Sequence, residues 1–246
     1  MAKLILATTR PGEPEIFHSL QGEGIAAGRP SVFVRLSGCN LQCHWCDTPY
    51  TWNFERTRHL HRDGAKYERA ANRMILGIEE VAAAIRSYPC PNLVITGGEP
   101  LLQQPALAAL CEVLGRDYHV EIESNGTLPL IPAFDGHVDQ LNLSLKLSHA
   151  GNAEAERLKP EVIQAYARDP RAWFKFVVAT MADVEEVAAL AARHDIPANR
   201  ILLMPEGTTS AAIRERMTWL APLSLARSYR LSDRLHIHLY GDTRGT

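Results

Sequence analysis

The sequence predicts an α/β fold built on a sheet of parallel strands. Short β-branched runs alternate with longer runs rich in Ala, Leu and Glu along most of the 246 residues. Strands that alternate with helices indicate βαβ units, whose strands run in parallel. With 46% hydrophobic and 22% charged residues, the composition is ordinary for a folded globular chain. No internal repeat or linker divides the pattern, so we expect one domain over residues 1–246.

In the first half of the chain, each expected strand ends at a turn that contains glycine. Gly38, Gly97 and Gly126 follow short apolar runs, where glycine favours a turn. Between these runs, apolar residues recur every three or four positions, which is the spacing of a helix with one buried side. The expected elements are a strand over 32–36, a helix over 78–88, a strand over 93–96, a helix over 101–114 and a strand over 120–123.

The second half of the chain continues the same alternation. Pro160 stands in the first turn of an expected helix, where its fixed backbone angle is favourable. His236 and His238 alternate along the last expected strand, and we expect both to be structural. The expected elements are a strand over 140–146, a helix over 160–167, a strand over 172–178, a helix over 182–194, a strand over 201–204, a helix over 210–220 and a strand over 235–240.

The composition indicates neither a membrane span nor an extended nucleic-acid surface. No stretch approaches the roughly 18 uncharged apolar residues that a span requires. A formal net charge of −2 provides no basic surface for a nucleic acid. Only four apolar residues follow Lys3, which is too few for a secretory signal. We therefore expect a cytoplasmic protein with no membrane and no nucleic-acid partner.

A polar segment near residues 55–73 interrupts the alternation of strands and helices. It contains six basic and three acidic residues, and we expect it to be inserted between the cysteine-rich loop and the next helix. A solvated surface excursion is the expected structure for such a segment. The alternative is a docking patch for an acidic electron donor.

Three motifs directly follow three of the expected strands. Gly38-Cys39 follows the first strand, Gly97-Gly98-Glu99 follows the second, and Ser124-Asn125-Gly126 follows the third. The carboxyl ends of parallel strands meet at one edge of a sheet, where active sites of α/β proteins collect. We therefore expect the three motifs to lie together, although they are far apart in the sequence.

Three of the five cysteines, Cys39, Cys43 and Cys46, form the pattern C-x3-C-x2-C. Thiolates this close can converge on one soft metal centre. A structural zinc site needs a fourth ligand, whereas three thiolates on a [4Fe–4S] cluster leave one iron open for a substrate or cofactor. We expect the open cluster; the alternatives are zinc with an outside fourth ligand and three packed cysteines. Cys90 and Cys111 are expected to pack in the core.

The segment CNLQCHWCDTPY resembles the cluster loop of radical S-adenosylmethionine (SAM) enzymes, and the segment TGGEP over 96–100 resembles their GGE motif. The resemblance implies a partial (β/α)6-type barrel and a [4Fe–4S] cluster that binds SAM at its open iron and cleaves it to a radical. The radical is generated at the cluster, so no catalytic side chain is assigned. For Lys146 the alternative is a surface position. The resemblance implies cluster ligation by Cys39, Cys43 and Cys46, and SAM contacts from Trp45, Cys46, Asp47, Gly98, Ser144, Leu145 and Lys146.

Further motifs resemble one family of this superfamily, the 7-carboxy-7-deazaguanine synthases. They are LQGEG over 20–24, CDT over 46–48, ESNGT over 123–127 and the ending HIHLYGDTRGT. The resemblance implies a lyase that converts 6-carboxy-5,6,7,8-tetrahydropterin to 7-carboxy-7-deazaguanine by ring contraction with loss of ammonia. In that family the product feeds 7-deazaguanine nucleosides such as queuosine.

The residues implied at the substrate suit a flat, carboxylated pterin. The forked guanidinium of Arg35 fits a carboxylate, with a surface-facing position as the alternative. Gln21 and Glu23 can pair with the polar edge of the pterin, with an ordinary turn as the alternative. Thr48 is implied as a ligand of Mg2+, which prefers hard oxygen atoms. The implied substrate contacts are Leu20, Gln21, Gly22, Glu23, Arg35, Thr96, Glu123 and Thr246.

The resemblance also implies partners. We expect a flavodoxin- or ferredoxin-like electron donor and a homodimer. The polar segment at 55–73 departs from the family pattern as a longer loop, which leaves the donor open. Two other functions stay possible at this point: an activating enzyme for a glycyl-radical enzyme, and a non-catalytic iron–sulfur redox sensor.

Overall fold

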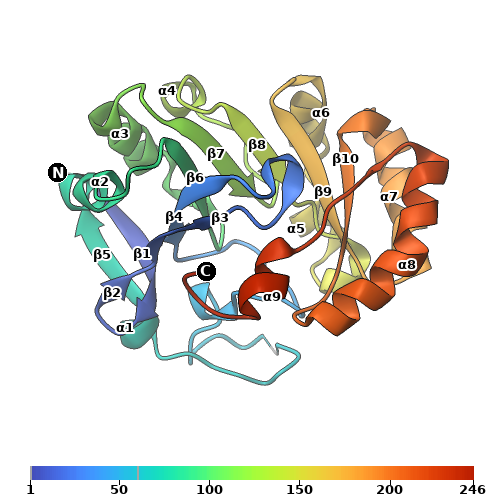
Figure 1. The fold of residues 1–246 in the computed structure, drawn as a ribbon, viewed down its shortest axis with the longest axis horizontal. Coiled ribbons are helices and arrows are strands. Elements are labelled where there is room, and N and C mark those ends of the chain that lie inside the picture. Colours follow the sequence, from blue (N-terminus) through green and yellow to red (C-terminus); the bar gives the residue numbers. More distant parts are fainter. Residues whose placement is uncertain (1, 60) are drawn as a thin grey trace.

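The computed structural model describes residues 2–59 and 61–246. The strands in these residues form one open, curved sheet (Figure 1). The strands lie in the order β11-β10-β9-β8-β7-β6-β4-β1-β2, with β3 paired to β4 and β5 paired to β1. Helices cover the outer side of the curve, while the C-terminal helix and the cysteine-rich loop lie on the inner side (Figure 1). This confirms the expected α/β fold with mostly parallel strands; the sheet is not closed.

The parallel part of the sheet forms the centre of the core. Every residue of β8 and β10 is buried, because helices cover one side of these strands and the cavity-forming loops cover the other. The strands are β4 (Pro30–Leu36), β6 (Asn92–Gly97), β7 (His119–Ser124), β8 (Gln140–Leu143), β9 (Ala172–Val178), β10 (Ile201–Pro205) and β11 (Arg230–Leu231).

The longer helices follow the expected sequence pattern closely, whereas the four-residue helices α4 (Pro132–Asp135) and α5 (Glu154–Arg157) were not predicted. Thr180 and Asp183 cap the start of α7, where the Asp183 carboxylate accepts hydrogen bonds from the Ala179 and Thr180 amides, both at 2.8 Å. The last expected helix continues past Leu220 to residue 227 and contains Pro222. The helices are α2 (Ile78–Arg86), α3 (Gln104–Leu114), α4 (Pro132–Asp135), α5 (Glu154–Arg157), α6 (Pro160–Arg168), α7 (Met181–His194) and α8 (Ser210–Arg227).

Strands before and beside the first expected one were not predicted. The expected first strand is the fourth in the chain, and four others add antiparallel pairs at this end of the sheet. The expected strand over 140–146 also ends early, at Leu143, so residues 144–146 lie beyond it. The unpredicted strands at this end are β1 (Lys3–Arg10), β2 (Glu13–Pro14), β3 (Ile16–Leu20) and β5 (Arg73–Gly77). The two-residue strand β11 at the other end was also not predicted.

The strand expected over 235–240 is wrong, because this segment is the helix α9 (Leu235–Tyr240). Its alternating His and aliphatic residues fit a strand, but it pairs with no strand in the described part of the chain. Instead, the Leu235 amide donates to the Gly22 carbonyl at 2.8 Å, which places α9 across the inner side of the sheet (Figure 1). Only Ile237 of this helix is buried.

The polar segment at 55–73, described apart from residue 60, ends in the short helix α1 (Arg69–Asn72). It lies against the cysteine-rich loop: His61 is buried, and its Nε2 atom lies 2.7 Å from the Cys46 carbonyl oxygen. The Arg62 amide donates to the His44 carbonyl at 3.0 Å. The segment is therefore a cover over this loop as well as a surface excursion.

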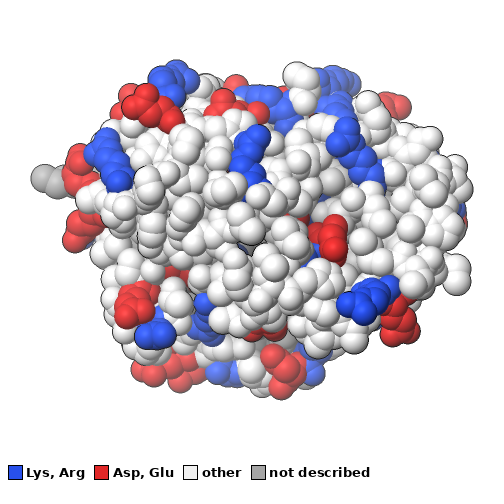
Figure 2. Space-filling view, in the orientation of Figure 1, with Lys and Arg blue, Asp and Glu red and all other residues white. Residues whose placement is uncertain are grey.

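None of the described helices is both long and apolar enough to cross a membrane. On the side of the molecule shown in Figure 2, basic and acidic side chains are interspersed around the rim.

Gly97 is required by the join between β4 and β6. Its φ is +138°, and a Cβ atom there would lie 2.2 Å from the Leu36 carbonyl oxygen. Strained backbone and overpacking each cost about 1–3 kcal/mol. We therefore predict that Gly97→Ala lowers the free energy of unfolding by about 3 kcal/mol, measured by urea denaturation of the metal-free protein.

The matched control for this prediction is Gly136→Ala. Gly136 has φ −66°, and a Cβ atom there meets nothing within 4 Å. This change should alter stability by no more than about 1 kcal/mol. Equal effects of the two substitutions would contradict the close approach at Gly97.

Candidate functional site

A cavity of about 550 Å3 opens at the carboxyl ends of the parallel strands. The three motifs that follow β4, β6 and β7 all line it, as expected from the sheet topology. The loop after β3, the cysteine-rich loop, the polar segment at 55–73 and α9 supply the remaining walls. The cavity therefore combines residues from nearly the whole length of the chain.

Cys39, Cys43 and Cys46 line one part of this cavity. Each sulfur accepts a hydrogen bond from a nearby N–H group. The donors are the Leu41 amide to Cys39 at 3.4 Å, Asn152 Nδ2 to Cys43 at 3.3 Å and Trp52 Nε1 to Cys46 at 3.4 Å. Donors aimed at sulfur stabilise thiolates and help to set the potential of a cluster.

Burial is the main influence on these three thiols. It raises the pKa of Cys39 to about 12 and that of Cys46 to about 11, and it also raises the pKa of Cys43. Positive metal centres favour the thiolate, so a buried soft site of this kind suits iron. The described residues contain no group of three His, Cys, Asp or Glu gathered for a single metal ion. A cluster makes a different demand, because each iron takes its own thiolate.

The Gly-Gly-Glu motif brings the strand end of β6 against the cysteine-rich loop. A Cβ atom at Gly98 would lie 2.1 Å from the Gly38 carbonyl oxygen, so only glycine permits this approach. Glu99 is fully buried, and its carboxylate accepts hydrogen bonds from the amides of Leu101 and Asn125 at 3.0 and 2.7 Å. Burial raises its pKa despite these bonds. Glu99 therefore holds the loop together rather than facing the cavity.

Trp45 and Lys146 lie at the edge of the cysteine region. The Trp45 ring stacks on His149, with centroids 5.2 Å apart, and Lys146 Nζ lies 5.6 Å from the centroid of the Trp45 ring. Lys146 also donates to Ser144 Oγ at 2.8 Å. Both Ser144 and Lys146 line the cavity, whereas Leu145 between them is buried in the core.

Arg35 reaches the cavity from within β4. Its Nε donates to the carboxylate of Glu15 at 2.8 Å, and the Tyr50 hydroxyl donates to the same carboxylate at 3.0 Å. Burial opposes the charge of Arg35, but Glu15 outweighs this and raises its pKa. The side chain of Arg35 is 17% exposed, while that of Glu15 is fully buried. A permanently charged guanidinium is thus fixed at the cavity wall.

Gln21 joins the loop after β3 to two acidic residues of β7. Its Nε2 donates to Glu121 at 2.7 Å and to Glu123 at 3.2 Å, and the Thr96 hydroxyl donates to Glu123 at 2.8 Å. Burial, together with the nearby Glu123, raises the pKa of Glu121 to about 7. Gln21, Thr96 and Glu123 line the cavity and offer both donors and acceptors there.

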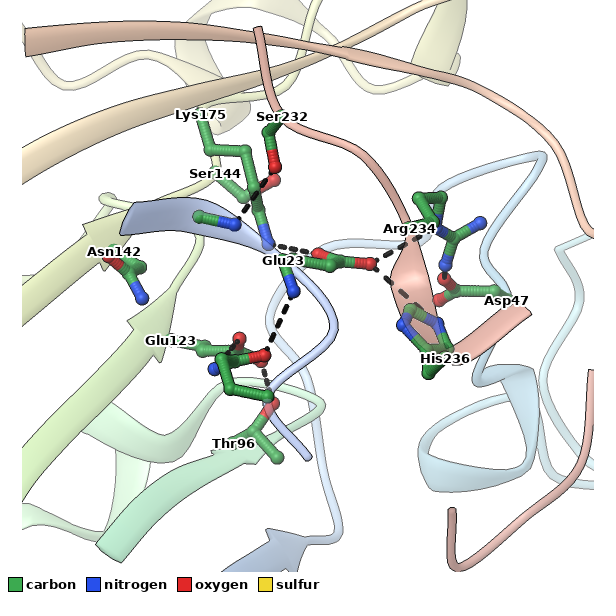
Figure 3. A network of polar contacts seen from close by, with 12 residues as sticks. Glu23, Asp47, Thr96, Glu123, Asn142, Ser144, Lys175, Ser232, Arg234 and His236 are labelled. Atoms are coloured by element: carbon green, nitrogen blue, oxygen red, sulfur yellow. Dashed lines mark hydrogen bonds and ion pairs between the residues drawn. The ribbon is translucent and has the colours of Figure 1, made fainter. Parts of the chain in front are cut away.

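A network of charges links Glu23 to the opposite wall (Figure 3). Glu23 accepts from Lys175 of β9 and from Arg234 Nε at 3.0 Å, and Arg234 also pairs with Asp47 of the cysteine-rich loop. His236 Nε2 lies 3.9 Å from Glu23. Burial disfavours the charge of Glu23, but Lys175 and Arg234 outweigh it and hold the pKa well below its usual range.

For Asp47, Lys175 and Arg234 too, neighbouring opposite charges outweigh the effect of burial on the pKa. Burial opposes each charge, although the Asp47 side chain is 39% exposed, and Arg234 lowers the pKa of Asp47. Glu23 raises the pKa of Lys175, while Asp47 and Glu23 raise the pKa of Arg234. All three residues stay ionised near neutral pH. They therefore place fixed charges of both signs around the cavity.

The cavity contains every residue that the sequence analysis assigned to a site, with the exception of Leu145. The assigned residues that line it are Leu20, Gln21, Gly22, Glu23, Arg35, Cys39, Cys43, Trp45, Cys46, Asp47, Thr48, Thr96, Gly98, Glu123, Ser144, Lys146 and Thr246. The Leu145 side chain faces the core, because adjacent residues in an extended segment point to opposite sides.

Sequence reasoning missed Lys175 and Arg234 as site residues and assigned His236 only a structural role. Lys175 interrupts the apolar strand β9, a signal equivalent to the one that singled out Arg35 in β4. Arg234 stands before α9 and carries no local pattern. Only the folded chain shows that it meets Glu23 and Asp47.

Comparisons with known proteins agree with this site. Residues 33–214 match the radical SAM superfamily. The chain is 39% identical to the 7-carboxy-7-deazaguanine synthase of Pyrobaculum aerophilum over 97% of this chain and 99% of the relative. It is 34% identical to that of Halobacterium salinarum over 94% and 91%. Among solved structures, QueE from Escherichia coli matches with a TM-score of 0.66 and 26% identity over 95% of both chains.

The chain therefore belongs to the radical SAM superfamily, whose members carry a [4Fe–4S] cluster and SAM. Within that superfamily it is a member of the 7-carboxy-7-deazaguanine synthase family of lyases.

The raised pKa of Glu121 predicts a specific loss of stability as the pH rises. In the folded protein Glu121 keeps its proton up to about pH 7, whereas in the unfolded chain it loses the proton near pH 4.5. Stability should therefore fall between these values and stay lower above pH 7. At about 1.4 kcal/mol per pKa unit, the loss is about 3 kcal/mol. Glu121→Gln should remove it, as measured by urea denaturation at pH 4.5 and pH 8.

Glu161→Gln is the matched control for this prediction. Glu161 is an exposed residue of α6. Glu161→Gln should therefore show the same pH dependence of stability as wild type. If Glu121→Gln and wild type lose the same stability between the two pH values, Glu121 does not carry the proton.

Proposed function

We propose that this protein converts 6-carboxy-5,6,7,8-tetrahydropterin to 7-carboxy-7-deazaguanine, contracting a ring with loss of ammonia. The main support is that one cavity combines the cysteine triad with Arg35 and with the polar set Gln21, Thr96 and Glu123. This combination offers a radical source, a carboxylate receptor and fixed partners for a flat heterocycle. The names of the relatives support the same reaction.

The cysteine region holds the cluster and SAM in this proposal. Cys39, Cys43 and Cys46 bind the cluster, and SAM lies near Trp45, Gly98 and Lys146, with Asp47, Ser144 and the backbone at Leu145 as further contacts. When bound, these groups supply radical hydrogen-abstraction chemistry. The buried N–H donors to sulfur and the close approach at Gly98 support this placement.

The pterin binds on the opposite side of the cavity in this proposal. Arg35 receives its carboxylate, since a forked guanidinium matches that group. Gln21, Glu23, Thr96 and Glu123 bind the polar edges of the rings, and the remaining contacts are Leu20, Gly22 and Thr246. Glu15 and Tyr50 hold Arg35 in place, and His236 of α9 lines the cavity. Fixed orientation at the reacting carbon is the main contribution of these residues.

Thr48 is the proposed ligand of Mg2+. Its hydroxyl lies 3.7 Å from Cys46 Sγ and lines the cavity. A carboxylated pterin brings its own hard oxygen atoms, so the cation can bridge the substrate and Thr48 without a complete protein cage.

We also propose a single catalytic domain that acts as a cytoplasmic homodimer and receives its electron from a flavodoxin- or ferredoxin-like protein. The continuous sheet supports one domain. The homodimer and the electron donor are proposed from the resemblance to the family.

The direct test is an anaerobic incubation of reconstituted protein with SAM, Mg2+, a reductant and the carboxypterin, followed by mass spectrometry. We expect 7-carboxy-7-deazaguanine from wild type and from Cys111→Ala, and none from Cys39→Ala. SAM cleavage without this product would favour a glycyl-radical activating enzyme. Failure to cleave SAM with an intact cluster would favour a redox sensor.

We predict that Arg35→Lys weakens binding of the pterin but not of SAM. Lysine keeps the positive charge but loses the two-pronged geometry. Loss of one charge-assisted contact costs roughly 1.5–3 kcal/mol, or about tenfold to over a hundredfold in affinity. Calorimetric titration of the reconstituted variant with each ligand measures the two affinities. Equal weakening of both would remove Arg35 from the substrate site.

We predict that Thr48→Val lowers turnover and weakens its response to Mg2+. Valine keeps the shape of threonine but has no ligand oxygen. The cluster spectrum and SAM binding should be retained. The measurement is product formation against Mg2+ concentration, with Thr218→Val on the exposed side of α8 as the control. Superimposable curves for Thr48→Val and wild type would place the metal elsewhere.

A further inference from the structure

Trp52 connects the cysteine triad to the outer surface of the molecule. Its indole ring is buried, and its Nε1 donates to Cys46 Sγ at 3.4 Å. On its other side, the ring meets His59 edge-on, with centroids 5.5 Å apart and planes at 61°. His59 belongs to the polar segment at 55–73 and is partly exposed. The two rings therefore form a short, continuous path from the surface to a cluster ligand.

Two arginines beside His59 are exposed and have no ion-pair partner. Arg56 and Arg58 form no ion pair with any acidic side chain in residues 2–59 and 61–246. Three of the other cations are engaged: Arg62 pairs with Glu206, Lys66 donates to backbone carbonyls, and Arg69 lies over the ring of Phe54. The sixth, Arg73, is half-buried in β5. Arg56 and Arg58 are therefore free to meet negative charge from outside.

The charge of this segment is opposite in sign to that of the chain. Six basic and three acidic residues give residues 55–73 a formal charge of +3, whereas the whole chain carries −2. Charge of one sign on a local surface steers a partner of the opposite sign to that surface. The cysteine-rich loop lies directly beneath, since His61 and Arg62 hydrogen-bond to its backbone.

We propose that Arg56, Arg58 and His59 form the docking site of a small acidic one-electron carrier protein, and that its electron enters through Trp52 to the iron bound by Cys46. The carrier loses one electron and the oxidised cluster gains one; no bond forms or breaks, and no proton is transferred. The proposal rests on the cluster assigned above, and it adds the place where the electron enters. Arg56, Arg58 and His59 do not line the cavity, so an acidic partner bound to them leaves the cavity free for the carboxypterin.

The first test measures reduction of the cluster without any pterin. Reconstituted wild type and the variant with Arg56→Glu and Arg58→Glu are mixed anaerobically with reduced flavodoxin, and the loss of cluster absorbance is followed in time. The charge reversal should slow reduction roughly tenfold or more at low salt, and the difference should shrink at high salt. Reduction by dithionite, a small inorganic reductant, should be unchanged.

Arg168→Glu is the matched control for the charge reversal. Arg168 is exposed on α6, on the outer side of the sheet and away from the polar segment (Figure 1). It should leave reduction by flavodoxin close to the wild-type rate. Equal rates for wild type and the Arg56 and Arg58 variant would overturn the docking site, as would an equal loss in the Arg168 control.

The second test concerns the path through Trp52. Trp52→Phe keeps an aromatic ring but removes the N–H donor to Cys46 Sγ. Since hydrogen bonds to sulfur raise the potential of a cluster, the midpoint potential should become more negative. Reduction by flavodoxin should also slow in this variant. An unchanged potential together with unchanged flavodoxin kinetics would overturn the role of Trp52.

The proposed reaction and the docking site fail separately. If wild type makes no 7-carboxy-7-deazaguanine, but flavodoxin reduces the cluster of the Arg56 and Arg58 variant more slowly than that of wild type, only the proposed reaction is contradicted. Product formation with dithionite in every variant, together with equal flavodoxin rates, would contradict only the docking site.

Discussion

The guanidinium of Arg234 is the constraint on which the cavity depends. It is 6% exposed and joins three segments that are distant in sequence. It donates to Glu23 in the loop after β3, to Asp47 in the cysteine-rich loop and to the Gly207 carbonyl after β10. The Glu23 side chain is only 13% exposed, and burial in a low dielectric disfavours its charge, so its ionised state depends on a neighbouring cation. Arg234 therefore keeps the walls of the cavity both charged and in place.

A second series of contacts, which also begins at an arginine, lies elsewhere along the cavity wall. Arg244 lies over the Tyr50 ring at 3.5 Å from its centroid, and the Tyr50 hydroxyl binds Glu15, which in turn binds Arg35. The C-terminal segment is thus fastened to the sheet at both Arg234 and Arg244. Rigid placement of Arg35 follows, and a preorganised cation of this kind suits recognition of a carboxylate.

The parallel half of the sheet was predictable because its strands are covered on both sides. Apolar runs such as those of β6 and β10 then end at turns that the sequence marks with glycine or polar residues. The antiparallel strands β2 and β5 were missed because short or partly exposed strands lack such runs, whereas β1 contains the apolar run Leu4–Ala7 and was overlooked although its pattern was present. The helix α9 was mistaken for a strand because six residues carry too little periodicity to separate the two structures.

The sequence by itself determined the class of fold and the cysteine triad, and nearly all of the site residues that it assigned do line the cavity. It could do so because three motifs follow the carboxyl ends of parallel strands, which meet at one edge, and because the other assigned residues match motifs of a known family. Only the tertiary structure decided which side chains of distant segments touch. The pairing of Arg234 with Glu23 and Asp47, and the contact of Trp52 with His59, depend on how loops cross over the sheet. Local sequence patterns do not predict these contacts, because tertiary packing, and not spacing along the chain, brings the side chains of distant loops together.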